Sequence, residues 1–217
     1  MSVTTRPTAD ETRERLLVAA EELFRRIGYY KTTVGDIADA LSMSSANIYR
    51  FFPSKMAINE ALCAKLLGGL LVDATHIARG GGTASERVFN LLMTLHRHHR
   101  EQMTNHERVH EMVTVAMEED WASIEAFIQG CKRLVGQLVA EGQALGEFGP
   151  GDPTMLGELV FGACAGVLHP VLITKCAREG LTGDEIDAQA QGLVAFALHA
   201  LANPQGFALA PSQEPLS

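Results

Sequence analysis

A cluster of histidines lies in one stretch of the sequence and could bind a metal ion: His96, His98, His99, His106 and His110. His106 and His110 are four residues apart, so on a helix both imidazoles would share one face, where a transition metal can bind. Glu107 follows His106, and the segment from His106 to His110 matches the H-E-x-x-H pattern, in which the glutamate is the general base of a zinc hydrolase.

The sequence leaves three interpretations of this cluster open. A zinc hydrolase would use His106 and His110 as ligands and Glu107 as base, but no third ligand stands in a recognisable context. A metal-responsive regulator would use the histidines from His96 to His110 as its effector site. We favour ordinary solvated or core histidines, and we therefore expect neither an enzyme nor a metal cofactor.

The segment from residue 33 to residue 55 could recognise the phosphates and bases of DNA. Thr33 and Ser44 stand where helix N-caps are expected, and short hydroxyls and free N–H groups at helix N-termini favour an anion. Arg50 could donate two hydrogen bonds to one guanine. These residue types are compatible with an interface for nucleic acid, but Thr33 and Ser44 would also serve as N-caps in any helical protein.

The elements that would position these groups are helices. Apolar residues recur at every third or fourth position along most of the chain, and no segment has the alternation of a strand. Pairs such as Thr8 with Glu11 and Thr33 with Asp36 have the spacing of capping boxes. The sequence predicts an all-α fold of about nine helices, at residues 10–27, 34–41, 45–51, 54–79, 84–99 and beyond, 105–117, 121–145, 155–177 and 185–202.

The first three predicted helices have the lengths and spacing of a helix-turn-helix domain. Two short helices joined by Ser42 and Met43 follow a longer amphipathic helix, and the second short helix would enter the major groove. We predict a flexible N-terminus at 1–9, a DNA-binding domain at 10–55 with the helix-turn-helix at 33–52, a helical effector-binding and dimerisation domain at 56–204, and a flexible tail at 205–217.

Residues 10–62 resemble the DNA-binding domain of the tetracycline repressor (TetR) family. The motifs that carry the resemblance are Gly28-Tyr29, Thr32-Thr33, Ile37-Ala38, Ser44, Ile48-Tyr49-Arg50-Phe51-Phe52 and Lys55. It implies contacts with the DNA backbone from Thr33, Ser44, Ser45, Tyr49 and Lys55, and contacts with base edges from Ala46, Asn47 and Arg50.

Three departures from the pattern of the family occur, one of which, Met56 and Ile58 after Lys55, is expected to affect packing and not recognition. Phe51 replaces the usual His or Tyr, so the hydrogen bond that this position gives to a phosphate is lost or moves to Tyr49. Ser42 stands where relatives often have glycine, which implies a conformational cost if the turn needs a positive φ. Phe52 is expected to be a core aromatic.

The charge is unevenly divided along the chain. The net charge is −8 overall, but residues 1–55 hold 8 Lys and Arg against 7 Asp and Glu, and residues 56–217 hold 10 against 19. The acidity therefore belongs to the second domain. Because the first domain is nearly neutral, its affinity for DNA must depend on dimerisation and on a few well-placed residues.

The resemblance also implies a homodimer that binds a palindromic double-stranded DNA operator and, as a repressor, leaves it when an unknown small-molecule effector binds. We predict that the effector pocket is lined by Met93, His96, Met103, Met112, Met117, Trp121, Phe127 and Phe161. We predict that the dimer interface contains Leu156, Val160, Cys164, Val167, Val194, Ala197 and Leu201. No run approaches about 18 consecutive apolar residues, so we expect a cytoplasmic protein that does not enter a membrane.

Overall fold

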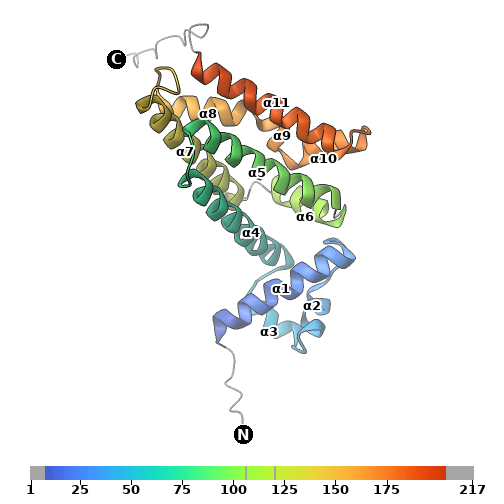
Figure 1. The fold of residues 1–217 in the computed structure, drawn as a ribbon. Helices are drawn as coiled ribbons and strands as arrows, with labels where there is room; N and C mark the ends of the chain where they lie inside the picture. Colours follow the sequence, from blue (N-terminus) through green and yellow to red (C-terminus); the bar gives the residue numbers. More distant parts are fainter. Residues whose placement is uncertain (1–7, 106, 120, 204–217) are drawn as a thin grey trace, which may run out of the picture.

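The computed structural model of this protein describes residues 8–105, 107–119 and 121–203. Every regular element in these residues is a helix, in the order α1 (Ala9–Ile27), α2 (Val34–Ala40), α3 (Ser45–Tyr49), α4 (Lys55–Ala78), α5 (Ala84–Asn105), α6 (Glu107–Glu118), α7 (Ala122–Ala144), α8 (Pro153–Ala163), α9 (Ala165–Leu168), α10 (Pro170–Arg178) and α11 (Gly183–Ala202). Figure 1 shows α1, α2 and α3 as a small group at one end, which α4 joins to the remaining helices. The all-α prediction is confirmed.

The starts of the N-terminal helices follow from their capping residues. The hydroxyl of Thr8 accepts a hydrogen bond from the backbone N–H of Glu11, and Thr33 does the same for Asp36. In both pairs the acidic side chain accepts in return from the backbone N–H of the threonine, so two otherwise unpaired donors of each helix are satisfied. Gly28 ends α1 with φ 103°, a conformation that favours glycine.

The core of the N-terminal domain extends beyond the predicted boundary at residue 55. Ile58 and Leu62, in the first turns of α4, are fully buried in the same cluster as Leu16, Phe24 and Ile37. One residue from far along the chain, Met112 of α6, is also buried in this cluster. The DNA-binding domain therefore includes the first two turns of α4 and is packed directly against α6.

The second core lies among α4, α5, α7, α8 and α11. Glycines allow α7 and α8 to pack very closely: a Cβ added at Gly157 would lie 2.6 Å from the backbone nitrogen of Gly136. All four cysteines are free, and burial raises the pKa of Cys131 to about 12 and that of Cys164 to about 11. These two thiols are core residues, as the sequence predicts.

The prediction of one helix at residues 155–177 is wrong. The chain forms three pieces instead, because it leaves the helical conformation at Cys164, with ψ 1°, and again at His169, with ψ 120°. Pro170 has no N–H to continue a helix and its ring disfavours the α conformation for the preceding residue. Because apolar residues recur at helical spacing through the whole segment, the sequence pattern did not indicate these interruptions.

Helix α4 is long and apolar enough, by length and composition alone, to cross a membrane. Its first turns belong to the N-terminal core, and its second half contributes Leu70, Ala74 and Ala78 to the other core. A helix that packs in two cores must be apolar along most of its length. The apolar composition of α4 is therefore weak evidence for a membrane span.

Candidate nucleic-acid interface

The turn between α2 and α3 contains the positive φ on which the expected conformational cost at Ser42 depends. Ser42 has φ 54°, in the left-handed region, and it is the position where relatives often have glycine. Its N–H donates to the carbonyl of Asp39 at 3.1 Å, and the N–H of Met43 donates to the carbonyl of Ala38 at 2.9 Å. The turn therefore holds α3 in a fixed direction relative to α2.

Both predicted N-cap hydroxyls are in place and accessible. Thr33 caps α2. Its backbone N–H and its hydroxyl both donate to the carboxylate of Asp36, at 2.7 and 2.8 Å, and these two hydrogen bonds lower the pKa of Asp36. The hydroxyl of Ser44 accepts from the N–H of Asn47 at 3.3 Å and caps α3. Both residues are exposed, so they can face a phosphate.

The predicted base-reading helix, α3, exposes one face. Ala46, Tyr49 and Arg50 are exposed, with Tyr49 at 52%. Ser45 and Asn47 are partly buried, and the amide of Asn47 donates to the sulfur of Met43 at 3.5 Å. Ile48 is fully buried and fixes the opposite face in the core, and Phe52, only 2% exposed, confirms its prediction as a core aromatic.

Lys55 is placed differently from the prediction that it contacts the DNA backbone. Its ammonium donates to the carbonyls of Tyr29 at 2.8 Å, Thr32 at 3.0 Å and Tyr30 at 3.4 Å, and it lies 4.4 Å from the centre of the Tyr29 ring. Partial burial lowers the pKa of Lys55, although the carboxylate of Glu111 opposes this effect. An ammonium has three N–H donors, and all three point to this loop. Lys55 therefore holds the α1–α2 loop to α4.

The α1–α2 loop is also bound by α6. The carboxylate of Glu111 accepts from the N–H of Tyr30 at 3.2 Å, and a Cβ at Gly28 would lie 3.0 Å from the same carboxylate oxygen. The amide of Asn59 in α4 donates to the carbonyl of Met112 at 3.4 Å. Met112 is part of the N-terminal core and so connects the two domains, and its place in an effector pocket stays a prediction.

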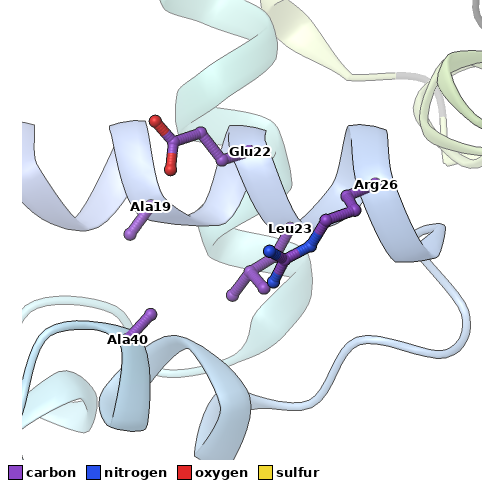
Figure 2. Close-up of a pocket in the computed structure, with 5 residues that line it drawn as sticks. All are labelled: Ala19, Glu22, Leu23, Arg26 and Ala40. Carbon is purple, nitrogen blue, oxygen red and sulfur yellow. The ribbon is translucent and has the colours of Figure 1, made fainter.

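The remaining residues predicted for an effector pocket are mostly core residues. Met93, Trp121 and Phe127 are buried, whereas Met117 and Phe161 are partly buried. The side chain of Met103 lies outside the described residues. A surface hollow between α1 and α2, lined by Ala19, Glu22, Leu23, Arg26 and Ala40, lies far along the chain from all of these (Figure 2).

The histidine cluster stabilises the break before Pro170. The Nδ1 atom of His96 lies 2.7 Å from the carbonyl oxygen of Val167, and Nδ1 of His99 lies 2.7 Å from that of Leu168. A carbonyl only accepts, so both Nδ1 atoms carry a proton, and they satisfy carbonyls at the end of α9. The Nε2 atom of His96 lies 3.0 Å from the carboxylate of Asp187, which also binds Arg100 at 2.7 Å. His96 is therefore a buried residue that joins three helices, and its place in an effector pocket stays a prediction.

These contacts give the metal alternative no support. No group of three or more histidine, cysteine or acidic side chains that could hold a metal ion occurs among the described residues. His106 lies outside the described part of the chain, as does the side chain of His110.

The predicted dimer-interface residues lie on the faces of their helices that pack inside the subunit. Val160, Cys164, Val194, Ala197 and Leu201 are buried inside the subunit, and Leu156 and Val167 are partly buried against the same core. The outward face of these helices carries Met155, Leu159 and Phe196 instead, which are 38%, 49% and 68% exposed. The helices are apolar on both faces, so periodicity alone could not show which apolar stripe faces the core.

Two functional features were missed in the sequence. Glu111 resembles an ordinary surface acid on α6, and Arg13 resembles a surface base on α1, yet each contacts residues near the helix-turn-helix. The partners are 81 and 38 residues away in the chain, so no local pattern could reveal them.

Comparisons with known proteins agree on both domains. Residues 16–62 match the family model of bacterial regulatory proteins of the tetR family, and residues 84–194 match that of the tetracyclin repressor-like C-terminal domain. The transcriptional regulator TtgR of Pseudomonas putida is 33% identical over 82 residues, which cover 38% of this chain and 37% of TtgR. The chain thus aligns with little more than a third of this relative's length.

Solved structures extend the similarity to most of the chain. A TetR/AcrR-family regulator from Thermobifida fusca is 26% identical with a TM-score of 0.59, covering 86% of this chain and 96% of its own. A transcriptional regulator from Cytophaga hutchinsonii, 19% identical, has the same fold with a TM-score of 0.70, over 88% of this chain and 98% of its own.

Proposed function

Because this chain belongs to the TetR family of DNA-binding transcriptional regulators, we propose that it is a homodimeric repressor that leaves a palindromic operator when a small molecule binds. The observation that carries the proposal is the short α3, capped by Ser44, which holds Tyr49 and Arg50 on its exposed side while Ile48 fixes it in the core. Such a protein acts in the cytoplasm, where its DNA is.

DNA recognition divides between two kinds of contact. Thr33, Ser44, Ser45 and Tyr49 hydrogen-bond to phosphates and set the position of α3 in the major groove. Ala46, Asn47 and Arg50 reach base edges, and Arg50 is the residue able to donate two hydrogen bonds to a guanine. Lys55 contributes by fixing the α1–α2 loop, because its ammonium is bound to three carbonyls of that loop.

Dimerisation uses the outward faces of α8 and α11. Leu159 of α8 and Phe196 of α11 expose about half or more of their surface, and small residues, Gly162 and Gly192 among them, are exposed on the same two helices. Large apolar side chains in this exposed position indicate a surface that a second protein covers. Two such subunits would place two copies of α3 on successive half-sites of a palindrome.

Effector release uses the contact between α6 and the DNA-binding domain. Glu111 and Met112 bind α6 to the loop and core beside the helix-turn-helix. A ligand that enters beside Met117, Trp121, Phe127 and Phe161 would displace α6 and so change the relative orientation of the two domains.

DNA binding is tested with the promoter region of the protein's own gene in a fluorescence-anisotropy titration. We expect Arg50→Ala to weaken specific binding by about 5- to 150-fold, the effect of about 1 to 3 kcal/mol from one bidentate base contact. Arg79→Ala is the matched control, because Arg79 is exposed at the distal end of α4 and the variant loses the same charge. Equal affinity of the wild type for this region and for unrelated DNA at physiological salt would overturn the proposal.

The dimer is tested by analytical ultracentrifugation. The wild type should sediment as a dimer, and Phe196→Glu should sediment as a monomer, because it places a charge in a desolvated interface. Leu145→Glu is the control, since Leu145 is 71% exposed in the turn after α7 and belongs to neither α8 nor α11. A monomeric wild type, or a dimeric Phe196→Glu variant, contradicts this interface.

A further inference from the structure

The end of α3 lacks the hydrogen-bond donor that the family pattern places there. Phe51 stands in the position of the usual His or Tyr, and it is partly buried against the N-terminal core. Its phenyl ring has no N–H or O–H to offer a phosphate. A contact with the DNA backbone at this end of the recognition helix therefore needs a donor from another residue.

A guanidinium from α1 is fixed at this position. The Nη1 atom of Arg13 donates to the carbonyl of Phe51 at 3.1 Å, and the guanidinium carbon lies 4.2 Å from the centre of the Phe52 ring. Phe52 is 2% exposed, so the ring is an immobile support, and a cation over an aromatic face is attracted to it. The charge of Arg13 is thereby fixed beside α3 although the residue belongs to another helix.

The guanidinium of Arg13 is exposed to solvent and has N–H donors beyond the one that bonds to Phe51. Arg13 is exposed, and a guanidinium has five N–H donors, of which the carbonyl of Phe51 takes one. Two neighbouring acids of α1 have partners of their own: the carboxylate of Glu11 accepts from the N–H of Thr8, and that of Glu14 pairs with Lys65. Figure 1 shows α3 beside the N-terminal half of α1, on the side away from the larger domain.

We propose that Arg13 donates to a phosphate of the operator and so replaces the contact that Phe51 cannot make. The proposal rests on the proposed function, since it adds one residue to the operator-binding surface. A guanidinium suits this role because its planar set of donors matches the geometry of a phosphate and its charge persists at any physiological pH. In a domain that is nearly neutral overall, one such cation is a large part of the electrostatic attraction to DNA.

The test is the salt dependence of operator binding for Arg13→Gln against Arg15→Gln. Arg15 lies two residues further along α1, is exposed, and makes no hydrogen bond or ion pair within the described part of the chain, so its variant removes the same charge from the opposite side of the helix. We expect Arg13→Gln to weaken binding about tenfold at 0.1 M salt and to lower the slope of log affinity against log salt by about 0.9, the value for one phosphate contact. Arg15→Gln should keep the wild-type slope.

Two further measurements separate a phosphate contact from a structural connection between α1 and α3. Adding Phe51→His to Arg13→Gln restores a donor at this end of the helix and should recover part of the affinity. Urea unfolding of the Arg13→Gln variant without DNA measures any loss of folding stability separately from the loss of binding. If Arg13→Gln lowers stability but leaves the salt slope at its wild-type value, the inference is overturned. If the wild type itself binds no operator, the proposed function fails, and this contact with it.

Discussion

The two domains differ in how far apart in the sequence the partners of their stabilising hydrogen bonds lie. In the DNA-binding domain, the hydrogen bonds that start α1, α2 and α3 join residues three apart. In the larger domain, the break before Pro170 is stabilised by His96, whose two partners are 71 and 91 residues away. Local bonds re-form wherever the helix forms, whereas distant bonds exist only when three helices have already assembled. We therefore expect the larger domain to be the more sensitive to single changes at its polar contacts.

The largest expected effect is at His96. Replacing it by alanine leaves the carbonyl of Val167 without a partner, removes one partner of Asp187, and opens a cavity in a fully buried position. We expect His96→Ala to lower the free energy of unfolding by about 3 to 5 kcal/mol, the sum of cavity and hydrogen-bond losses. Urea denaturation followed by circular dichroism measures this change.

His76→Ala is the matched control, since His76 is exposed on α4. It should change the free energy of unfolding by less than about 0.5 kcal/mol. Should His96→Ala be as stable as His76→Ala, the break before Pro170 does not depend on the histidine, and the contrast between the domains disappears.

The second effect is a pH dependence at His99. Burial lowers the pKa of His99 in the folded protein to about 4, below its ordinary value of 6.5. As the pH falls through 6.5 the unfolded chain takes up a proton first, so stability is complete above pH 6.5 and is lost progressively toward pH 4. A pKa difference of this size between the folded and unfolded protein corresponds to about 3 kcal/mol in the free energy of unfolding.

The variant His99→Asn isolates this contribution from the other titrating groups. The pKa values of His98 and His169 are also lowered by burial, so the wild type loses stability at acid pH from several residues at once. The difference in free energy of unfolding between wild type and variant should therefore shrink by about 3 kcal/mol between pH 7 and pH 4. A difference that stays constant over this range means that His99 titrates normally in the folded state.

The sequence was sufficient for the helix starts and the turn of the first domain, because these signals are local. Thr8, Thr33 and Ser44 cap the helices at the predicted positions, and Ser42 has the positive φ that its place in the family pattern implied. The larger domain was predicted only as a set of helices. The break before Pro170 has a local cause, the proline itself, but the apolar periodicity on both sides of it led to the prediction of one continuous helix. Which apolar face of α8 and α11 packs inward depends on the partner helix, and a single sequence does not contain that information.

A moderate effect is expected at Thr33, where the bonds are local. Thr33→Ala removes the acceptor for the N–H of Asp36 and should lower the free energy of unfolding by about 1 kcal/mol. Thr33→Ser keeps the hydroxyl and should stay within about 0.5 kcal/mol of the wild type. Both are measured by urea denaturation, with DNA affinity recorded separately. A loss for Thr33→Ala as large as that for His96→Ala would show that local contacts in this chain are no less critical than distant ones.

The smallest expected effect has the opposite sign and lies in the turn of the helix-turn-helix. Ser42 has φ 54°, and a side chain in this region is disfavoured relative to glycine because of its Cβ. Ser42→Gly removes that strain but makes the unfolded chain more flexible, which offsets part of the gain. We expect a net rise in the free energy of unfolding of about 0.5 kcal/mol. Ser42→Ala keeps the Cβ and should show no rise, so a gain shared by both variants would place its origin in the exposed hydroxyl and not in the backbone of the turn.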